Sequence, residues 1–169
     1  ATRIVNAAIS HNDIRTGQSC PSKTLSFPVC LAHEFATDIA IFRFSTPLPH
    51  LDKPADPKFV ELYQTSMATT LSESMRFAAA NILDIQDSEI RSSFKIRDGY
   101  VDVILYDSVP GGAGYAKRLQ DESMNTILEK SVSLLTCKDN CDRACRKCLC
   151  DYSNQMRWDK FNRKPILKW

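Results

Sequence analysis

The sequence predicts an α+β domain in which a small antiparallel sheet packs against two helices. Three observations favour this class. Residues 36–44 alternate along a run of β-forming side chains, two further β-rich runs flank an Asp-Gly pair, and two longer segments repeat apolar residues at steps of three and four. The chain has 169 residues, 43% hydrophobic and 25% charged, so one globular domain fits and disordered or fibrous classes are excluded.

The first predicted elements are a strand and a long helix. Residues 36–44 predict the strand, and the loop at 46–57 that follows holds four prolines, which exclude a helix or a central strand there. Apolar side chains then recur at helical spacing over residues 58–83. The run Ala78–Ala80 makes one face of this helix small, so another backbone can approach it closely.

A β-hairpin is predicted next. Ile90–Ile96 and Tyr100–Tyr106 are β-rich runs on either side of Asp98 and Gly99. Asp-Gly between two such runs is typical of a tight hairpin turn, because the turn requires positive φ angles. Alternate residues of the second run, from Val101 onward, share one apolar face.

Two further helices complete the predicted elements. Apolar spacing predicts one over residues 114–135, and a short polar helix is expected over residues 149–163. The chain is thus expected to divide into an irregular entry segment (1–30), an α+β core (31–136) and a C-terminal segment (137–169) rich in cysteine, basic and aromatic residues.

The cysteines are the unusual feature of the composition, because five of the seven lie within fourteen residues near the C-terminus. These five are Cys137, Cys141, Cys145, Cys148 and Cys150. Gaps this short let tight turns direct several thiolates to one Zn²⁺ ion. Disulfides or free thiols are the alternatives, but the odd total and the absence of an export signal favour zinc.

Four thiolates complete a tetrahedral zinc site, so one of the five is in excess. Cys145 and Cys148 form the tightest pair, and Cys137 and Cys141 form the second. Cys150 is the spare thiol, or it replaces one of the four. A closed four-thiolate site leaves no position for water or substrate, so its role is structural. The full predicted fold class is therefore α+β with a small antiparallel sheet, two packed helices and a C-terminal zinc knuckle of four cysteines.

Residues 106–115 join the hairpin to the next helix and contain three of the five glycines. A glycine-rich turn before a helix can bind an anion on its backbone amides, but the Gly-Lys-Ser/Thr ending of a phosphate loop is missing. We therefore expect a tight strand-to-helix crossing. The alternative is a hydrolase or metal-dependent nuclease near this turn. Its candidate residues are Ser108, His33, Asp38, Asp102 and Asp107.

The C-terminal segment is also basic, with nine basic and four acidic residues between Lys138 and Trp169. Aromatic residues lie among these charges, a combination that suits a phosphate backbone and stacked bases. The other interpretation is a solvated face around the metal site. The candidate nucleic-acid contacts are Arg143, Arg146, Lys147, Arg157, Lys160, Arg163 and Lys164.

Three motifs of the chain resemble the MrfA-type zinc-binding (MZB) family. They are the Tyr-Asp-x-x-Pro-Gly-Gly-Ala-Gly turn at 106–114, the cysteine segment that ends in Tyr-Ser-Asn-Gln at 152–155, and His-Glu-Phe-Ala-Thr-Asp at 33–38. The resemblance runs from about residue 31 to 165. The chain departs from the family pattern in the wider spacing of its first two cysteines, in Ala144 and in the extra Cys150.

The resemblance implies that Cys137, Cys141, Cys145 and Cys148 bind zinc. It also implies a domain found at the C-terminus of DEAD/H-type DNA-repair helicases, or in DrmB-type proteins of the DISARM anti-phage system. Neither Gly-Lys-Thr nor Asp-Glu-x-His occurs in the 169 residues, so helicase activity is expected in another domain or subunit.

The expected function is a non-catalytic, zinc-binding accessory domain of a helicase-associated, DNA-processing system in anti-phage defence or DNA repair. DNA and a helicase subunit or fused helicase domain are the expected partners. A third hypothesis, besides the accessory domain and the hydrolase or nuclease, is a protein-interaction module that uses Ala78–Ala80, Trp158 or Trp169. No membrane partner and a cytoplasmic location are expected, because no apolar stretch of spanning length and no signal pattern are present.

Overall fold

The computed structural model describes residues 2–4, 16, 18–19, 29–31, 34–45, 56–97 and 100–169. The chain divides into two compact units, Ala1–Phe35 and Ala36–Trp169. In the first unit, β1 (Thr2–Ile4) pairs with β2 (Val29–Leu31) in antiparallel fashion. The candidate residue His33 and most of the proline-rich loop lie outside the described residues. Over the part of the chain described, no helix is long and apolar enough to cross a membrane.

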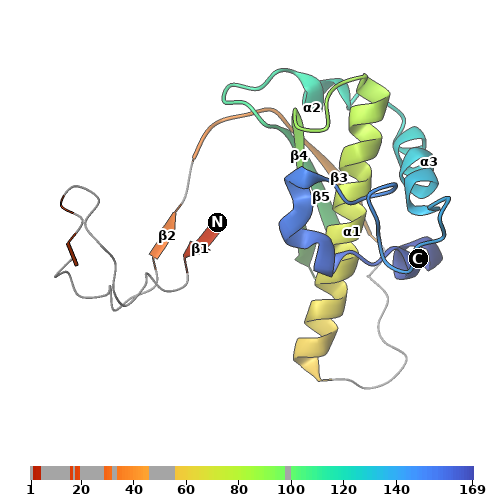
Figure 1. Ribbon diagram of the computed structural model, residues 1–169. Helices are drawn as coiled ribbons and strands as arrows, with labels where there is room; N and C mark the ends of the chain where they lie inside the picture. The colour runs from red at the N-terminus through yellow and green to blue at the C-terminus, as the bar shows by residue number, and fades with distance from the viewer. Residues whose placement is uncertain are drawn as a thin grey trace. The chain divides into compact units, whose positions relative to one another are not determined.

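The described residues of the second unit contain one antiparallel sheet of three strands (Figure 1). These are β3 (Ile39–Phe44), β4 (Ile90–Arg97) and β5 (Tyr100–Asp107), in the order β3-β5-β4. Arg97 lies opposite Tyr100, which confirms the predicted hairpin. The alternation along β5 is also confirmed, because Val101, Val103 and Leu105 are all buried.

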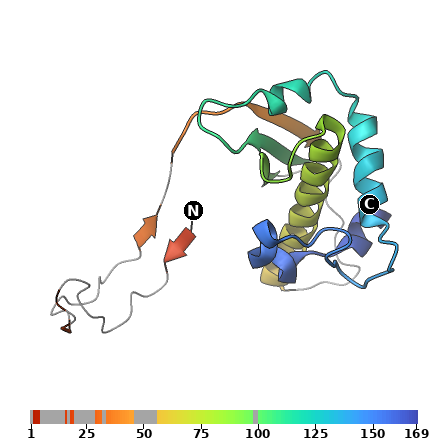
Figure 2. The same ribbon diagram turned by 45° about the horizontal axis from the view of Figure 1, so that its top comes forward.

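Helix α1 (Pro57–Leu83) is the central element of this unit (Figures 1 and 2). It begins one residue earlier than predicted, because proline is compatible with the first helical position and the side chain of Asp56 accepts a hydrogen bond from the amide of Lys58 at 2.8 Å. Every residue from Met67 to Ala80 is buried. The helix contacts β4, β5 and the C-terminal helices, so the small Ala78–Ala80 face is used within the chain itself.

The helix predicted over 114–135 is wrong as one element, because the structure divides it into α2 (Tyr115–Arg118) and α3 (Met124–Leu135). Four consecutive polar residues, 120–123, separate the two apolar patterns and offer nothing to bury. Ser123 has the extended φ and ψ of −65° and 131° that begin a new helix. Helix α3 then packs along α1.

The C-terminal segment also differs in detail from the prediction of one short helix. Residues Tyr152–Lys160 form η1, a 3-10 helix that begins with a capping box made by Asp151 and Asn154. A further helix, α4 (Arg163–Lys168), follows and was not predicted. Pro165 lies in its first turn, where a missing amide proton costs no hydrogen bond.

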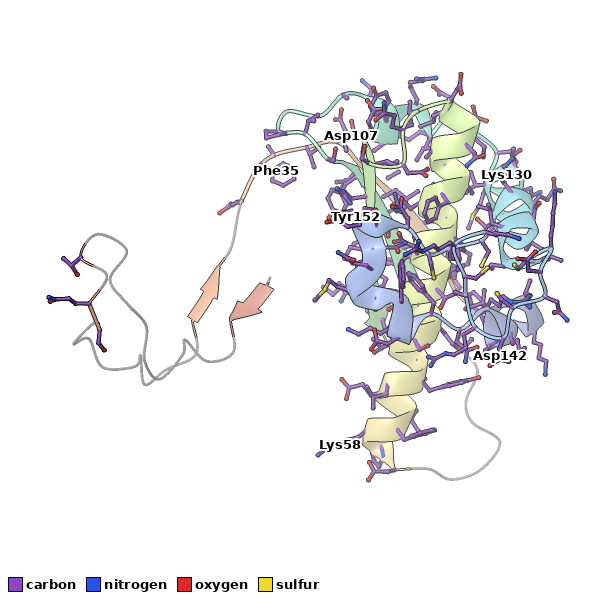
Figure 3. The ribbon with its side chains drawn as sticks, in the orientation of Figure 1. Phe35, Lys58, Asp107, Lys130, Asp142 and Tyr152 are labelled. Carbon is purple, nitrogen blue, oxygen red and sulfur yellow. The ribbon has the colours of Figure 1, made fainter. Side chains whose placement is uncertain are left out.

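The glycine-rich turn is held by the buried carboxylate of Asp107 at the end of β5. This carboxylate accepts hydrogen bonds from the amides of Ala113 (2.6 Å), Tyr115 (3.1 Å) and Ala116 (2.7 Å). Figure 3 labels Asp107 close to α2. An anion would need these same amides, so the turn is a structural crossing and its own acid occupies the place of a ligand.

Residues 36–38 pack on this turn, which is why β3 begins only at Ile39. The hydroxyl of Thr37 donates to the carbonyl of Asp107 at 3.0 Å, and the amide of Gly111 donates to the carbonyl of Ala36 at 2.8 Å. Gly112 approaches Asp38 so closely that an added Cβ would lie 2.6 Å from its Oδ2 atom. Residues 36–38, the second half of the motif at 33–38, therefore pack together with the turn at 106–114.

Two glycines of the turn offer a matched test of this packing. Both have positive φ, +85° at Gly111 and +76° at Gly112, but an added Cβ at Gly111 meets nothing within 4 Å. We expect Gly111→Ala to lower the free energy of unfolding by about 1–2 kcal/mol through backbone strain alone. Gly112→Ala should lower it further, because Asp38 must also move. Equal melting temperatures of the two variants would contradict the close approach.

Candidate metal centre

The cysteine segment, residues 137–150, follows α3 and consists of two tight turns. In the first turn the amide of Asn140 donates to the carbonyl of Cys137 at 2.9 Å, and Asn140 has a φ of +46°. In the second, the amide of Cys148 donates to the carbonyl of Cys145 at 3.1 Å. The amide of Cys145 in turn points at the sulfur of Cys148 at 3.1 Å. Each turn therefore carries two cysteines toward the same place.

Four sulfurs converge there: Cys137, Cys141, Cys145 and Cys148 have their Sγ atoms within 4.8 Å of one another. The sulfur–sulfur distances are 3.6 Å for Cys137 and Cys145, and 3.8 Å for Cys141 and Cys148. Tetrahedral zinc with bonds of about 2.3 Å requires sulfurs about 3.8 Å apart. The four thiols therefore fit a zinc ion.

The same distances do not fit the disulfide alternative, because bonded sulfurs lie about 2.05 Å apart. All five cysteines of the segment carry free thiols. Cys150 is half-buried and is not among the four sulfurs that converge.

The pKa values of three of the converging thiols depart from the ordinary cysteine value, in different directions. Burial raises the pKa of Cys148 to about 12 and also raises the pKa of Cys141. Burial opposes ionisation of Cys137 too, but hydrogen bonds from the backbone at Asp139 and Cys141 and from neighbouring thiols lower its pKa to about 7. A divalent ion would displace the protons from the buried thiols when it binds.

Arg163 of α4 supports the cysteine segment and is itself buried. Its guanidinium donates to the carbonyls of Cys141 (2.7 Å) and Leu135 (3.1 Å) and to Oδ1 of Asn140 (2.9 Å). This residue was a predicted nucleic-acid contact, but the structure places its charge inside the fold, where it positions the first turn.

Asn154 of η1 joins the cysteine segment to α1. Its amide nitrogen donates to the carboxylate of Glu73 and to the carbonyl of Leu149, both at 2.8 Å. Its Oδ1 atom accepts from the amide of Asp151 (2.9 Å) and from the indole of Trp158 (2.8 Å). Glu73 was not predicted from the sequence as a supporting residue, although Glu73 and Arg76 form an i,i+3 charged pair within a helix of small and apolar residues.

The remaining predicted nucleic-acid contacts are all exposed, on or near this segment. They are Arg143, Arg146, Lys147, Arg157, Lys160 and Lys164. Some have neighbours within the chain: Lys147 pairs with Asp139 at 2.8 Å, Lys164 pairs with Asp142, and Arg143 donates to the carbonyl of Asp159 at 2.6 Å. Figure 3 labels Asp142 at the edge of this region.

The acids proposed for a nuclease lie in different surroundings. Asp38 and Asp107 are neighbours at the glycine turn, but Asp102 of β5 pairs with Arg43 of β3 at 2.7 Å. Within the described residues, the four cysteines are the only group of three or more His, Cys, Asp or Glu side chains with metal-ligand geometry.

Trp169 was named for the alternative of a protein-interaction module. In the structure its ring packs on Phe44 of the same chain, with ring centroids 5.6 Å apart.

Comparisons with known proteins agree with this centre. Residues 71–149, which include all four converging cysteines, match the model of the MrfA Zn-binding domain, MZB. The Druantia protein DruE of Escherichia coli (strain UMEA 4076-1) is 30% identical over 145 residues, which make up 80% of this chain and 8% of DruE.

A solved structure has a similar fold, that of the DUF1998 helicase MrfA bound to DNA. The TM-score is 0.55 at 19% identity, and the match covers 93% of this chain and 19% of the MrfA chain. This chain therefore spans only a small part of either relative. On the family match and the four converging thiols, residues 71–149 form an MrfA Zn-binding (MZB) domain.

Proposed function

We propose that this chain is a structural zinc-binding accessory domain of a helicase-associated, DNA-processing protein. The observation that carries the proposal is the convergence of four thiols within 4.8 Å inside an MZB domain. Cys137, Cys141, Cys145 and Cys148 would hold one Zn²⁺ ion. Four thiolates fill a tetrahedral shell, so the ion supplies cross-linking of the segment and no open position for chemistry.

The metal would stabilise a segment that has little apolar surface of its own. In residues 137–150, the buried apolar side chain besides cysteine is Leu149. A zinc ion compensates for this by fixing both turns at once, and its binding energy then becomes folding energy. The exposed basic residues on the turns and on η1 are held in place as a result.

Contact with DNA is proposed from the charge of this surface together with the relatives. The exposed basic side chains lie on the cysteine segment, on η1 and on α4, where they can neutralise phosphates. The fold is shared with a helicase whose structure contains DNA. We infer that a helicase, as a fused domain or a separate subunit, supplies the ATP-driven activity.

A role in anti-phage defence is proposed from DruE, a Druantia defence protein. The relative favours a Druantia-like system over the DISARM system expected from the sequence resemblance. DNA repair is the alternative biological setting, in keeping with the resemblance to MrfA-type proteins.

The cysteine residues give a direct test of the zinc site. We expect wild-type protein to retain about one zinc per chain after dialysis. Cys145→Ser and Cys148→Ser should each lose the metal and melt at lower temperature, because a serine hydroxyl is a poor zinc ligand. Cys150→Ser is the matched control and should keep both the metal and the melting temperature. Zinc content by plasma mass spectrometry checks this, and loss of zinc from Cys150→Ser would refute the assignment of ligands.

The proposed DNA contact is tested by removing two charges at a time. Lys147→Gln with Lys160→Gln should weaken DNA binding and reduce the slope of log K against log salt by about 2, since each lysine releases about one counterion. Lys58→Gln with Lys130→Gln removes the same charge from exposed positions on α1 and α3 and should leave the slope unchanged. Fluorescence anisotropy over a salt series measures both. Equal slopes for the two double variants would contradict a specific basic surface.

A further inference from the structure

We propose that the hollow beside η1 binds one unpaired nucleobase of a single DNA strand. The inference rests on the proposed DNA contact and assigns it a definite place. The hollow has a volume of about 460 Å³ and lies between η1, the cysteine segment and the turn after α1. Pockets that enclose small ligands are about 300–1,000 Å³, so one base with its sugar fits.

Tyr152 forms the outer wall of the hollow and is 82% exposed. A tyrosine so exposed contributes little to the core, yet its backbone is firmly held. Asp151 accepts a hydrogen bond from the amide of Ser153 at 2.9 Å, and Asn154 fixes the same turn from its buried position. Figure 3 shows Tyr152 on the η1 ribbon. An exposed aromatic ring on a fixed backbone is suited to stacking on a base.

The inner wall combines a second aromatic ring with a positive charge. The guanidinium of Arg146 lies 5.5 Å from the ring centroid of Trp158, and both side chains line the hollow. Trp158 is fixed by its hydrogen bond to Asn154. Arg146 is exposed, so its charge is available to the phosphate of a nucleotide whose base enters beside the indole.

Polar groups in the hollow can contact the edge of a base. The carboxylates of Asp87 and Asp151 and the amide of Gln155 line it. Carboxylates accept hydrogen bonds from exocyclic amino groups such as that of cytosine. In duplex DNA this edge is paired and the base faces are stacked, so only an unpaired base can enter.

A second set of charges suits the path of the strand beyond the hollow. Arg157 of η1 does not line the hollow but lines a smaller depression together with Arg91 of β4. Its side chain is 46% exposed and lies 3.8 Å from the carboxylate of Glu73. A single DNA strand that runs along η1 would thus place one base in the hollow and meet two arginines at the smaller depression.

The test compares three variants of the full 169-residue chain with the wild type. Affinity for short single-stranded oligo(dC) and for a duplex is measured by fluorescence anisotropy. We expect Tyr152→Ala to weaken single-strand binding on the order of tenfold and to leave duplex binding unchanged. Tyr152→Phe keeps the ring and should bind as the wild type does. Met156→Ala is the matched control, because Met156 is 85% exposed on the same helix but does not line the hollow.

Cys150 provides an independent measure of position, because it also lines the hollow. Oligo(dC) should slow alkylation of its thiol in the zinc-loaded protein, as followed by peptide mass spectrometry, and duplex DNA should not. Unchanged binding by Tyr152→Ala, or equal losses in Tyr152→Ala and Met156→Ala, would overturn the base site while the DNA contact stands. Absence of DNA binding by the wild type at low salt would overturn the proposed function itself, and the base site with it.

Discussion

The hydrogen bonds and ion pair of the buried Glu73 carboxylate are the interactions on which the rest of the unit Ala36–Trp169 depends. It lies in the middle of α1 and is 2% exposed. Arg76 pairs with it at 2.6 Å, Ser92 of β4 donates to it at 3.1 Å, and Asn154 donates to it at 2.8 Å. An ionised carboxylate is costly to bury unless its hydrogen bonds are satisfied, and removal of one partner of a buried pair typically costs about 3–5 kcal/mol. The helix, the edge strand and η1 are therefore fixed to one another by one group.

The Glu73 carboxylate and the four thiols each support a different part of the C-terminal segment. The thiols hold its two turns on one side, and Asn154 connects its far end to α1 on the other. The hydrogen bonds of a 3-10 helix are weaker than those of an α-helix, so such helices are usually short. With nine residues, η1 is unusually long. Its stability here comes from the capping box and from the indole of Trp158, which both converge on Asn154. The position of the hollow beside η1 follows from these contacts.

The features that the sequence predicted correctly depend on neighbours along the chain. An Asp-Gly pair is enough to predict the hairpin, and the spacing of the cysteines is enough to predict that their sulfurs meet. The break between α2 and α3 was missed because the apolar spacing on either side resembles one helix, and only the four polar residues between them indicate otherwise. Features that depend on distant partners were missed or misjudged. Arg163 counts as one more basic residue in the sequence, yet in the fold its guanidinium meets acceptors on residues 135, 140 and 141.

Two motifs most resembled reactive or ligand-binding sites in the sequence: the glycine turn and the cysteine segment. At the glycine turn, the amides that could bind an anion already donate to Asp107. At the cysteine segment, four thiolates around one ion would leave no coordination position for a substrate. In both places the polar groups are used to fix the backbone. We therefore look for recognition to exposed side chains on a backbone that the fold holds in place, and Tyr152 and Arg146, which line the same hollow, meet that requirement.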